Sequence, residues 1–279
     1  MNLSVSKTFE LPYQAPYAWP QLFRFLQARV IDGLEAITQD FDGGDCYSRT
    51  IEYRDTRGYF TVKNSPEKRA LIVCIYLNQD KYCDELIQRL KLVLDVNAPI
   101  NQIDQQLQGC FGNAIDYQLG LRVPGLWGYF EAGVRAILGQ QVSIIAARNL
   151  VQAFVENLGE KIELKESQLR YFFPRPEAIV ESELDFFKMP QARKDCLRAL
   201  ASHFLTADNP RDVDAWIDIK GIGPWTINYV KMRAVKDPDV WLLGDAGLKN
   251  ALKTLSTPLD IELLKPWRSY ATFQLWNQL

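Results

Sequence analysis

The sequence predicts an α+β fold in which a small N-terminal antiparallel α/β domain precedes a long all-helical part. Of the 279 residues, 47% are apolar and 24% are charged, a composition typical of globular domains with sizeable cores. Three extended segments with short connections lie within the first hundred residues, and short connections imply antiparallel pairing. After Ile100 the strand patterns end, and helical patterns follow one another to Leu279.

The N-terminal region combines helical and extended patterns. From about residue 16 to 31, apolar residues recur at helical spacing. Extended segments follow at 47–53, 59–63 and 70–77, with a turn-like stretch ending in Gly58 between the first two. A second helix, from about residue 82 to 94, closes this region before Asn97-Ala98-Pro99.

The remainder of the chain predicts helices only. One is expected at 130–138 and another at 144–157, where Ser143 is placed to cap the second helix and Gly159 follows it. Further helices are expected at 176–188, 191–206, 211–218, 224–235, 245–255, 258–264 and 266–277. No repeat or low-complexity tract interrupts this order.

Composition excludes several classes of function. His203 is the only histidine, so a multi-histidine metal site cannot form, and its apolar surroundings favour packing over catalysis. The five cysteines form no C-x-x-C pair, which argues against a zinc ribbon, a redox pair or an iron–sulfur cluster. We therefore expect no metal and no cofactor. No apolar run reaches eighteen residues and the N-terminus lacks a signal-peptide core, so we expect a cytoplasmic protein without membrane association.

The most specific local motif is the stretch at 219–226, with the sequence IKGIGPWT. Gly221 and Gly223 allow a tight turn with positive φ, and Pro224 suits the first turn of the helix that follows. Such a helix–hairpin–helix presents backbone N–H groups that can hold a phosphate. The alternative is an ordinary helix–helix turn without a ligand.

Charge is concentrated near this hairpin. The whole chain has a formal net charge of −2, which argues against binding nucleic acid by bulk attraction. Residues 186–198 and 220–236 together nevertheless carry +7. We expect a focused basic face that binds one short stretch of DNA, the alternative being ordinary solvated helix faces.

Several motifs in one order resemble the AlkA-type branch of the helix–hairpin–helix DNA glycosylases, the 3-methyladenine-DNA glycosylase II family. They are residues 130–143 (FEAGVRAILGQQVS), 188–190 (KMP), the hairpin, 243–245 (LGD) and 265–271 (KPWRSYA). The match extends into residues 17–29, so the resemblance covers nearly the whole chain. The resemblance implies an antiparallel domain at 1–105, a helical domain with the hairpin at 130–237, and a second helical domain formed by 106–129 with 238–279. It also implies a monomer that flips alkylated bases such as 3-methyladenine and 7-methylguanine out of double-stranded DNA and removes them, leaving an abasic site.

The resemblance assigns a role to individual residues. Asp245, 22 residues after Gly223, matches the catalytic aspartate, which would stabilise an oxocarbenium ion or orient water. The alternative for Asp245 is a helix N-cap. Trp225, Tyr229 and Trp276 match the base pocket, and core packing is their alternative. Relatives that also cleave the DNA backbone carry a lysine at the position of Trp225, so a monofunctional hydrolase is expected.

The remaining assignments concern DNA contacts. Gly221, Gly223, Thr226 and Lys220 of the hairpin are expected to bind phosphate, and Gln141 matches the residue that fills the hole left by the flipped base. Two other functions stay open at this point. One is a glycosylase for oxidised or mismatched bases, and the other is a DNA-binding module that senses lesions without catalysis.

Overall fold

A five-stranded antiparallel sheet forms the N-terminal part of the molecule in the computed structural model, which describes residues 3–39, 43–164 and 167–279. Its strands are β1 (Val5–Pro12), β2 (Glu35–Gln39), β3 (Asp45–Tyr53), β4 (Thr56–Ser65) and β5 (Ala70–Leu77), in the order β1-β5-β4-β3-β2. Phe60, Val62, Val73 and Ile75 alternate along β4 and β5 and are fully buried. This alternation places one face of the sheet on a core.

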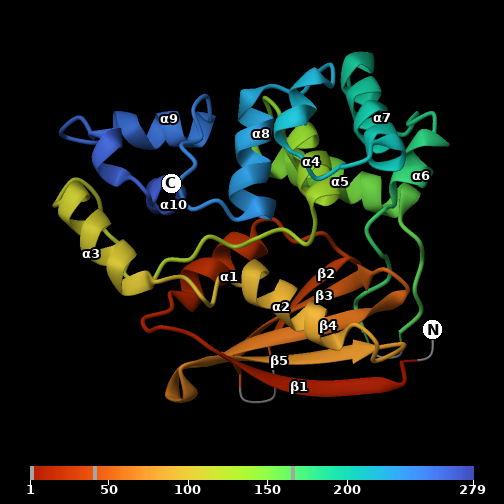
Figure 1. Ribbon diagram of the computed structural model, residues 1–279, viewed down its shortest axis with the longest axis horizontal. Helices are drawn as coiled ribbons and strands as arrows, with labels where there is room; N and C mark the ends of the chain where they lie inside the picture. Colours follow the sequence, from red (N-terminus) through yellow and green to blue (C-terminus); the bar gives the residue numbers. More distant parts are fainter. Residues whose placement is uncertain (1–2, 40–42, 165–166) are drawn as a thin grey trace.

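Helices α1 (Trp19–Gln27) and α2 (Cys83–Val93) cover that face (Figure 1). Trp19, Leu22 and Phe23 of α1 and Leu86 and Leu90 of α2 pack with the buried sheet residues in one apolar cluster. The i, i+3, i+4 spacing of these residues puts them on one side of each helix.

Two groups of helices lie on the same side of the sheet (Figure 1). The first contains α4 (Tyr129–Gly139), α5 (Ile144–Leu158), α6 (Pro176–Val180), α7 (Gln191–Thr206) and α8 (Pro224–Val230). The second contains α3 (Ile100–Phe111), α9 (Ala246–Lys253) and α10 (Arg268–Trp276). Each group has its own apolar cluster.

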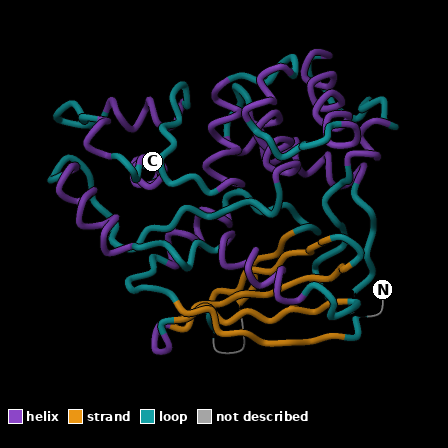
Figure 2. Tube along the Cα trace, viewed as in Figure 1, coloured by secondary structure: helices purple, strands orange, loops and turns teal. Residues whose placement is uncertain are grey.

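Shorter helical turns connect these elements (Figure 2). They are the 3-10 helices η1 (Pro66–Lys68), η2 (Asp214–Asp218) and η4 (Ile261–Leu264), and one π-helical turn, η3 (Lys231–Val235), that continues α8. His203 packs edge-on against Phe204 and Trp216, in agreement with a packing role.

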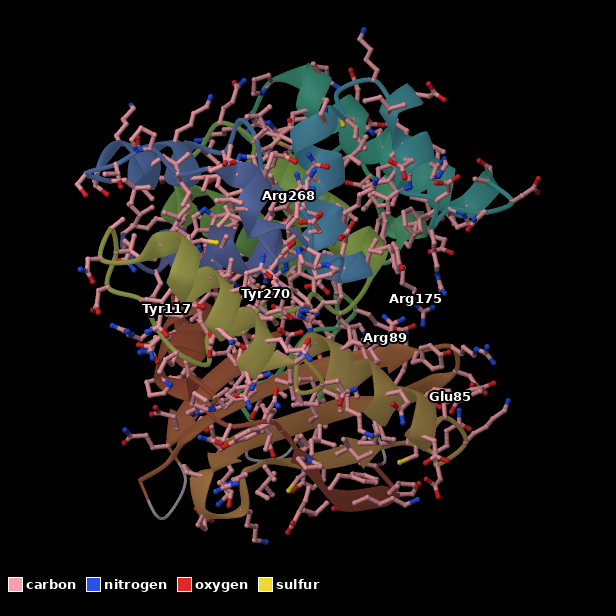
Figure 3. The ribbon with its side chains drawn as sticks, turned by 60° about the vertical axis from the view of Figure 1, so that its left-hand side comes forward. Glu85, Arg89, Tyr117, Arg175, Arg268 and Tyr270 are labelled. Atoms are coloured by element: carbon pink, nitrogen blue, oxygen red, sulfur yellow. The ribbon has the colours of Figure 1, made fainter. Side chains whose placement is uncertain are left out.

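Long-range polar contacts join the parts. Asp95, just after α2, accepts hydrogen bonds from the backbone of Val123 at 3.0 Å and from the hydroxyl of Tyr270 in α10 at 3.0 Å. Arg175, labelled in Figure 3, precedes α6 and forms an ion pair with Glu52 of β3. The sheet is thereby tied to both helical groups.

The predicted fold class is confirmed, and most predicted elements occur where expected. Three elements were missed: β1, an edge strand with mostly exposed side chains; β2, which is short; and α3. The helix predicted at 176–188 is only the five-residue α6, and that at 211–218 is the short η2. The division into three domains stays a prediction, and its boundary at 105/106 falls inside α3, whose apolar residues on both sides join the cluster of α9 and α10.

Within the described part of the chain, no helix is long and apolar enough to cross a membrane.

Candidate active site

A cavity of about 610 Å³ lies between α1, the segment 121–127, the start of α5, α8, and the ends of α9 and α10. This volume is within the range of small-molecule sites. The cavity brings together Asp245, Trp225, Tyr229 and Trp276, which lie far apart in the sequence. All four were candidate site residues.

Asp245 is held from three directions. Its Oδ1 accepts hydrogen bonds from the backbone N–H of Leu248 at 2.8 Å and from the indole Nε1 of Trp276 at 3.0 Å. Its Oδ2 accepts from the indole Nε1 of Trp225 at 3.3 Å. Asp245 is therefore the N-cap of α9 and also a half-buried carboxylate facing the cavity, so the two alternatives are not exclusive.

Aromatic rings form two walls of the cavity. Trp225 and Tyr229, one turn apart on α8, stack with ring centroids 5.5 Å apart. Trp276 of α10 lies parallel to Phe25 of α1, with an interplanar angle of 13° and centroids 6.5 Å apart. Flat apolar surfaces of this kind suit stacking on a nucleobase.

Among the cavity residues that sequence reasoning missed are Phe25 of α1, Arg29 just after α1, and Arg233 of η3. Phe25 and Arg29 are four residues apart in the helix predicted from about 16 to 31, and that spacing would place them on one face of a helix. Arg233 belongs to the segment that was read as a basic surface, yet it is only 3% exposed.

A buried ion-pair network lies beside the cavity and joins the sheet to α4. Glu35 of β2 pairs with Arg49 of β3 at 3.0 Å and with Arg135 of α4 at 3.0 Å. Glu131 of α4 pairs with Arg135 at 2.8 Å and with Arg49. Burial alone would raise the pKa of Glu131, but the charges of Arg49 and Arg135 lower it below its ordinary value.

The hairpin has the predicted turn, with one difference. Gly221 has φ +96°, where a side chain would be strained, but Gly223 has φ −119° and forms the N-cap of α8. Lys220 is exposed. Thr226 is only 1% exposed, and its hydroxyl accepts a hydrogen bond from Nε2 of Gln140 at 3.1 Å, so its side chain is turned away from solvent.

Gln140 connects the hairpin to the end of α4. Its Nε2 also donates to the carbonyl of Gly221 at 3.0 Å, and its own carbonyl accepts from Arg193 at 3.0 Å. The next residue, Gln141, has φ +57° and is exposed, and Val142 and Ile144 beside it are exposed and line the cavity. Gln141 therefore lies at the mouth of the cavity on a segment anchored to the hairpin.

The expected basic face is wrong in most of its members. The side chains of Arg233, Lys236 and Lys194 are about 10% exposed or less. Lys236 also forms an ion pair with Asp95 at 3.2 Å. Lys231 pairs with Asp214 at 2.6 Å, and Arg198 pairs with Asp195 and Glu183. Long cationic side chains can bury their stems while their charged ends find partners within the fold. Of the lysines in the two segments, Lys188 and Lys220 are the exposed ones.

The chain is similar in sequence to known DNA glycosylases. The family model described as the AlkA N-terminal domain matches residues 8–128. DNA-3-methyladenine glycosylase 2 of Escherichia coli (strain K12) is 28% identical over 283 residues, covering 96% of both chains. The chain belongs to the AlkA family of 3-methyladenine DNA glycosylases.

Other AlkA relatives agree with this membership. The probable bifunctional transcriptional activator/DNA repair enzyme AlkA of Mycobacterium tuberculosis (strain CDC 1551 / Oshkosh) is 30% identical over 296 residues, which cover 98% of this chain and 57% of that protein. The structure of 3-methyladenine DNA-glycosylase from Archaeoglobus fulgidus superposes with a TM-score of 0.75 and 17% identity, covering 97% of each chain. The latter likeness supports the fold of the AlkA family as described above.

The described residues contain no group of three or more His, Cys, Asp or Glu side chains that could hold a metal ion.

Proposed function

We propose that this AlkA-family protein is a DNA glycosylase that flips alkylated bases out of double-stranded DNA and hydrolyses their N-glycosidic bonds, leaving an abasic site. The observation that carries the proposal is the Asp245 carboxylate, fixed by two indole N–H groups at the wall of an aromatic cavity. The family relationship supports the same reaction.

The geometry suits cleavage of a glycosidic bond. As the base leaves, an oxocarbenium cation develops on the deoxyribose, and a fixed anion nearby stabilises it. At about 4 Å and an effective dielectric near 20, the attraction is about 4 kcal/mol, or roughly a thousandfold in rate if it acts only in the transition state. Because three donors fix the carboxylate in advance, little reorganisation is needed.

The hairpin and the cavity mouth support contacts to DNA. The backbone at Gly223 is open, since no heavy atom lies within 4 Å of where a Cβ would be, and exposed Lys220 lies nearby in sequence. Gly221 shapes this turn, and Thr226 would contribute through its backbone, because its hydroxyl faces Gln140. Gln141 is proposed to fill the hole in the duplex.

The enzyme is proposed to be monofunctional and to act as a monomer. No lysine is among the described residues that line the cavity, and Trp225 stands where a Schiff-base amine would be required. One chain supplies every residue of the candidate site. Because the proposed substrate is chromosomal DNA, we place the enzyme in the cytoplasm of a bacterial cell.

The decisive experiment is to incubate the protein with duplex DNA containing 3-methyladenine or 7-methylguanine and to detect free base by chromatography. We expect free base and intact backbone with abasic sites. Tight, lesion-selective binding without release would instead identify a lesion sensor. Release of 8-oxoguanine in preference to the alkylated bases would identify a glycosylase for oxidised bases.

A further inference from the structure

Arg29, two residues after the end of α1, and Arg233 of η3 lie in the same cavity as Asp245 without a carboxylate partner in the described chain. Arg29 donates to the carbonyl of Phe25 at 3.1 Å, and its guanidinium lies 3.7 Å from the centroid of the Phe25 ring. Arg233 donates to the carbonyl of Pro124 at 2.6 Å and to the hydroxyl of Tyr229 at 3.3 Å. Neither positive charge is neutralised by these contacts.

Three of the other five described arginines that line the cavity differ in this respect, whereas buried Arg122 donates to four backbone carbonyls. Arg49 and Arg135 are balanced by Glu35 and Glu131, and Arg148 lies 3.7 Å from Asp32. Among the residues that the structure describes, seven arginines and two acidic residues line the cavity. The arginines are Arg24, Arg29, Arg49, Arg122, Arg135, Arg148 and Arg233, and the acids are Glu35 and Asp245.

Burying a cation without a counter-ion is unfavourable, so such an arrangement calls for a compensating function. Burial lowers the pKa of Arg29 to about 10, which still leaves its side chain protonated at neutral pH. Two guanidinium groups thus add positive charge to the wall of the cavity that a flipped base would fill.

We propose that Arg29 and Arg233 are catalytic residues that stabilise negative charge on an uncharged damaged base as it departs, an inference that rests on the glycosylase function proposed above. When the bond between C1′ and the base nitrogen breaks, both bonding electrons go to the nitrogen. A base that is neutral within the nucleotide therefore leaves as an anion. Water then adds to C1′ and loses one proton, and the departing base gains one proton, so the reaction is balanced.

The same charges act in the opposite sense on cationic lesions. A base such as 7-methylguanine carries a positive charge in the nucleotide and leaves neutral, so its departure requires no cation. The two arginines repel this base in the ground state, while Asp245 and the aromatic walls attract it. The arginine pair consequently determines the rate for neutral lesions, and Asp245 serves both classes.

The test compares two duplexes of one sequence, containing hypoxanthine as the neutral base and 7-methylguanine as the cationic base, under single-turnover conditions. Arg29→Met should slow hypoxanthine release at least tenfold and leave 7-methylguanine release within threefold of wild type, or faster. Arg29→Lys, which keeps the charge, should recover most of the lost rate. Arg170→Met, which removes an exposed arginine outside the cavity, is the matched control and should change neither rate.

Each outcome of this comparison supports or overturns the proposed role of the two arginines. Equal slowing of both substrates in Arg29→Met would show a structural or DNA-binding role and overturn the proposal. Failure of wild type to release hypoxanthine while it releases 7-methylguanine would also overturn it, leaving the glycosylase function intact. Release of neither base would overturn the glycosylase function itself. Arg233→Lys provides a second charge-conserving variant, and it should retain hypoxanthine release within threefold.

Discussion

Asp245 is the N-cap of α9 and is also the carboxylate to which we assign the proposed chemistry. The oxygen that caps α9 also accepts the Trp276 indole N–H, and the other oxygen accepts the Trp225 indole N–H. The cap fixes where the carboxylate lies, and the indoles fix its rotation. Ordinary helix capping thus helps to fix the orientation of the carboxylate that we propose to be catalytic.

Asp245→Asn should keep the fold but lose base release. Asparagine is as good an N-cap as aspartate, so the free energy of unfolding should change by less than about 1 kcal/mol. The lost charge should lower single-turnover release of 7-methylguanine about a thousandfold, with duplex affinity unchanged. A release rate within tenfold of wild type would contradict the role of Asp245.

Trp225 predicts the absence of lyase chemistry. Product DNA should keep intact abasic sites, and borohydride should trap no covalent protein–DNA adduct, because a Schiff base needs an unprotonated amine at C1′. Lys249, exposed one turn after Asp245, is the nearest amine in sequence. Strong trapping that disappears in Lys249→Ala would show that Lys249 reaches the sugar, and trapping that survives would point to another amine.

At the scale of elements, the two hairpin glycines have different tasks. Gly221 has a left-handed backbone, and an added Cβ would lie 2.9 Å from Sγ of Cys196. Gly223 has an ordinary extended conformation with open space around it. Gly221 therefore allows the turn to form, and Gly223 keeps the backbone surface of the hairpin free of a side chain.

Alanine at each position should separate folding from binding. Gly221→Ala should lower stability by at least about 1–2 kcal/mol, the cost of a left-handed non-glycine residue. Gly223→Ala should leave the thermal unfolding midpoint unchanged and weaken binding to all duplex sequences alike, because the added methyl group meets the phosphate surface. Altered sequence preference at unchanged affinity in Gly223→Ala would contradict this assignment.

Helices and strands were predictable from the sequence where the pattern of apolar residues was clear, and they were missed where polar residues obscured it. The strand predicted at 70–77 coincides with β5, a continuous apolar run, and the helix predicted at 191–206 coincides with α7. β1 and β2 were missed because polar residues occupy half or more of their positions. The spacing of Ile100, Ile103 and Leu107 would have revealed α3.

The site was predictable only in part, for a reason that belongs to the whole molecule. Trp225 and Asp245 lie near the hairpin motif in sequence, but Phe25 lies in α1 and Arg29 just after it, about 200 residues away. No local pattern indicates that α1 packs beside α8. The same limit explains the basic segments, because burial of Lys236 depends on Asp95 from a distant turn.

The network of Glu35, Arg49, Glu131 and Arg135 should control how the sheet is held against α4. Glu131→Gln leaves buried guanidinium groups without one of their counter-ions and should cost about 3–5 kcal/mol of unfolding free energy at neutral pH. Glu10→Gln, which removes an exposed pair with Lys68, should cost less than about 1 kcal/mol. Equal effects in urea unfolding would contradict a structural role for the network.

The network also predicts a pH dependence. The pKa of Glu131 is lower in the folded state than its ordinary value of 4.5, so its ionised form stabilises the protein fully above that pH. This contribution is lost as the pH falls through the lower, folded-state pKa. Wild type should therefore lose stability more steeply below pH 4.5 than Glu131→Gln, as measured by urea midpoints across this range.

The indole contacts of Asp245 have an optical consequence. Trp225 and Trp276 are fluorophores whose N–H groups are bonded to a carboxylate and whose ring faces line the space for a flipped base. Stacking of a base on either ring would quench emission, and rebinding of solvent after product release would restore it. The protein thus carries an intrinsic signal with which each stage of base extrusion can be followed in time, without labelling the DNA.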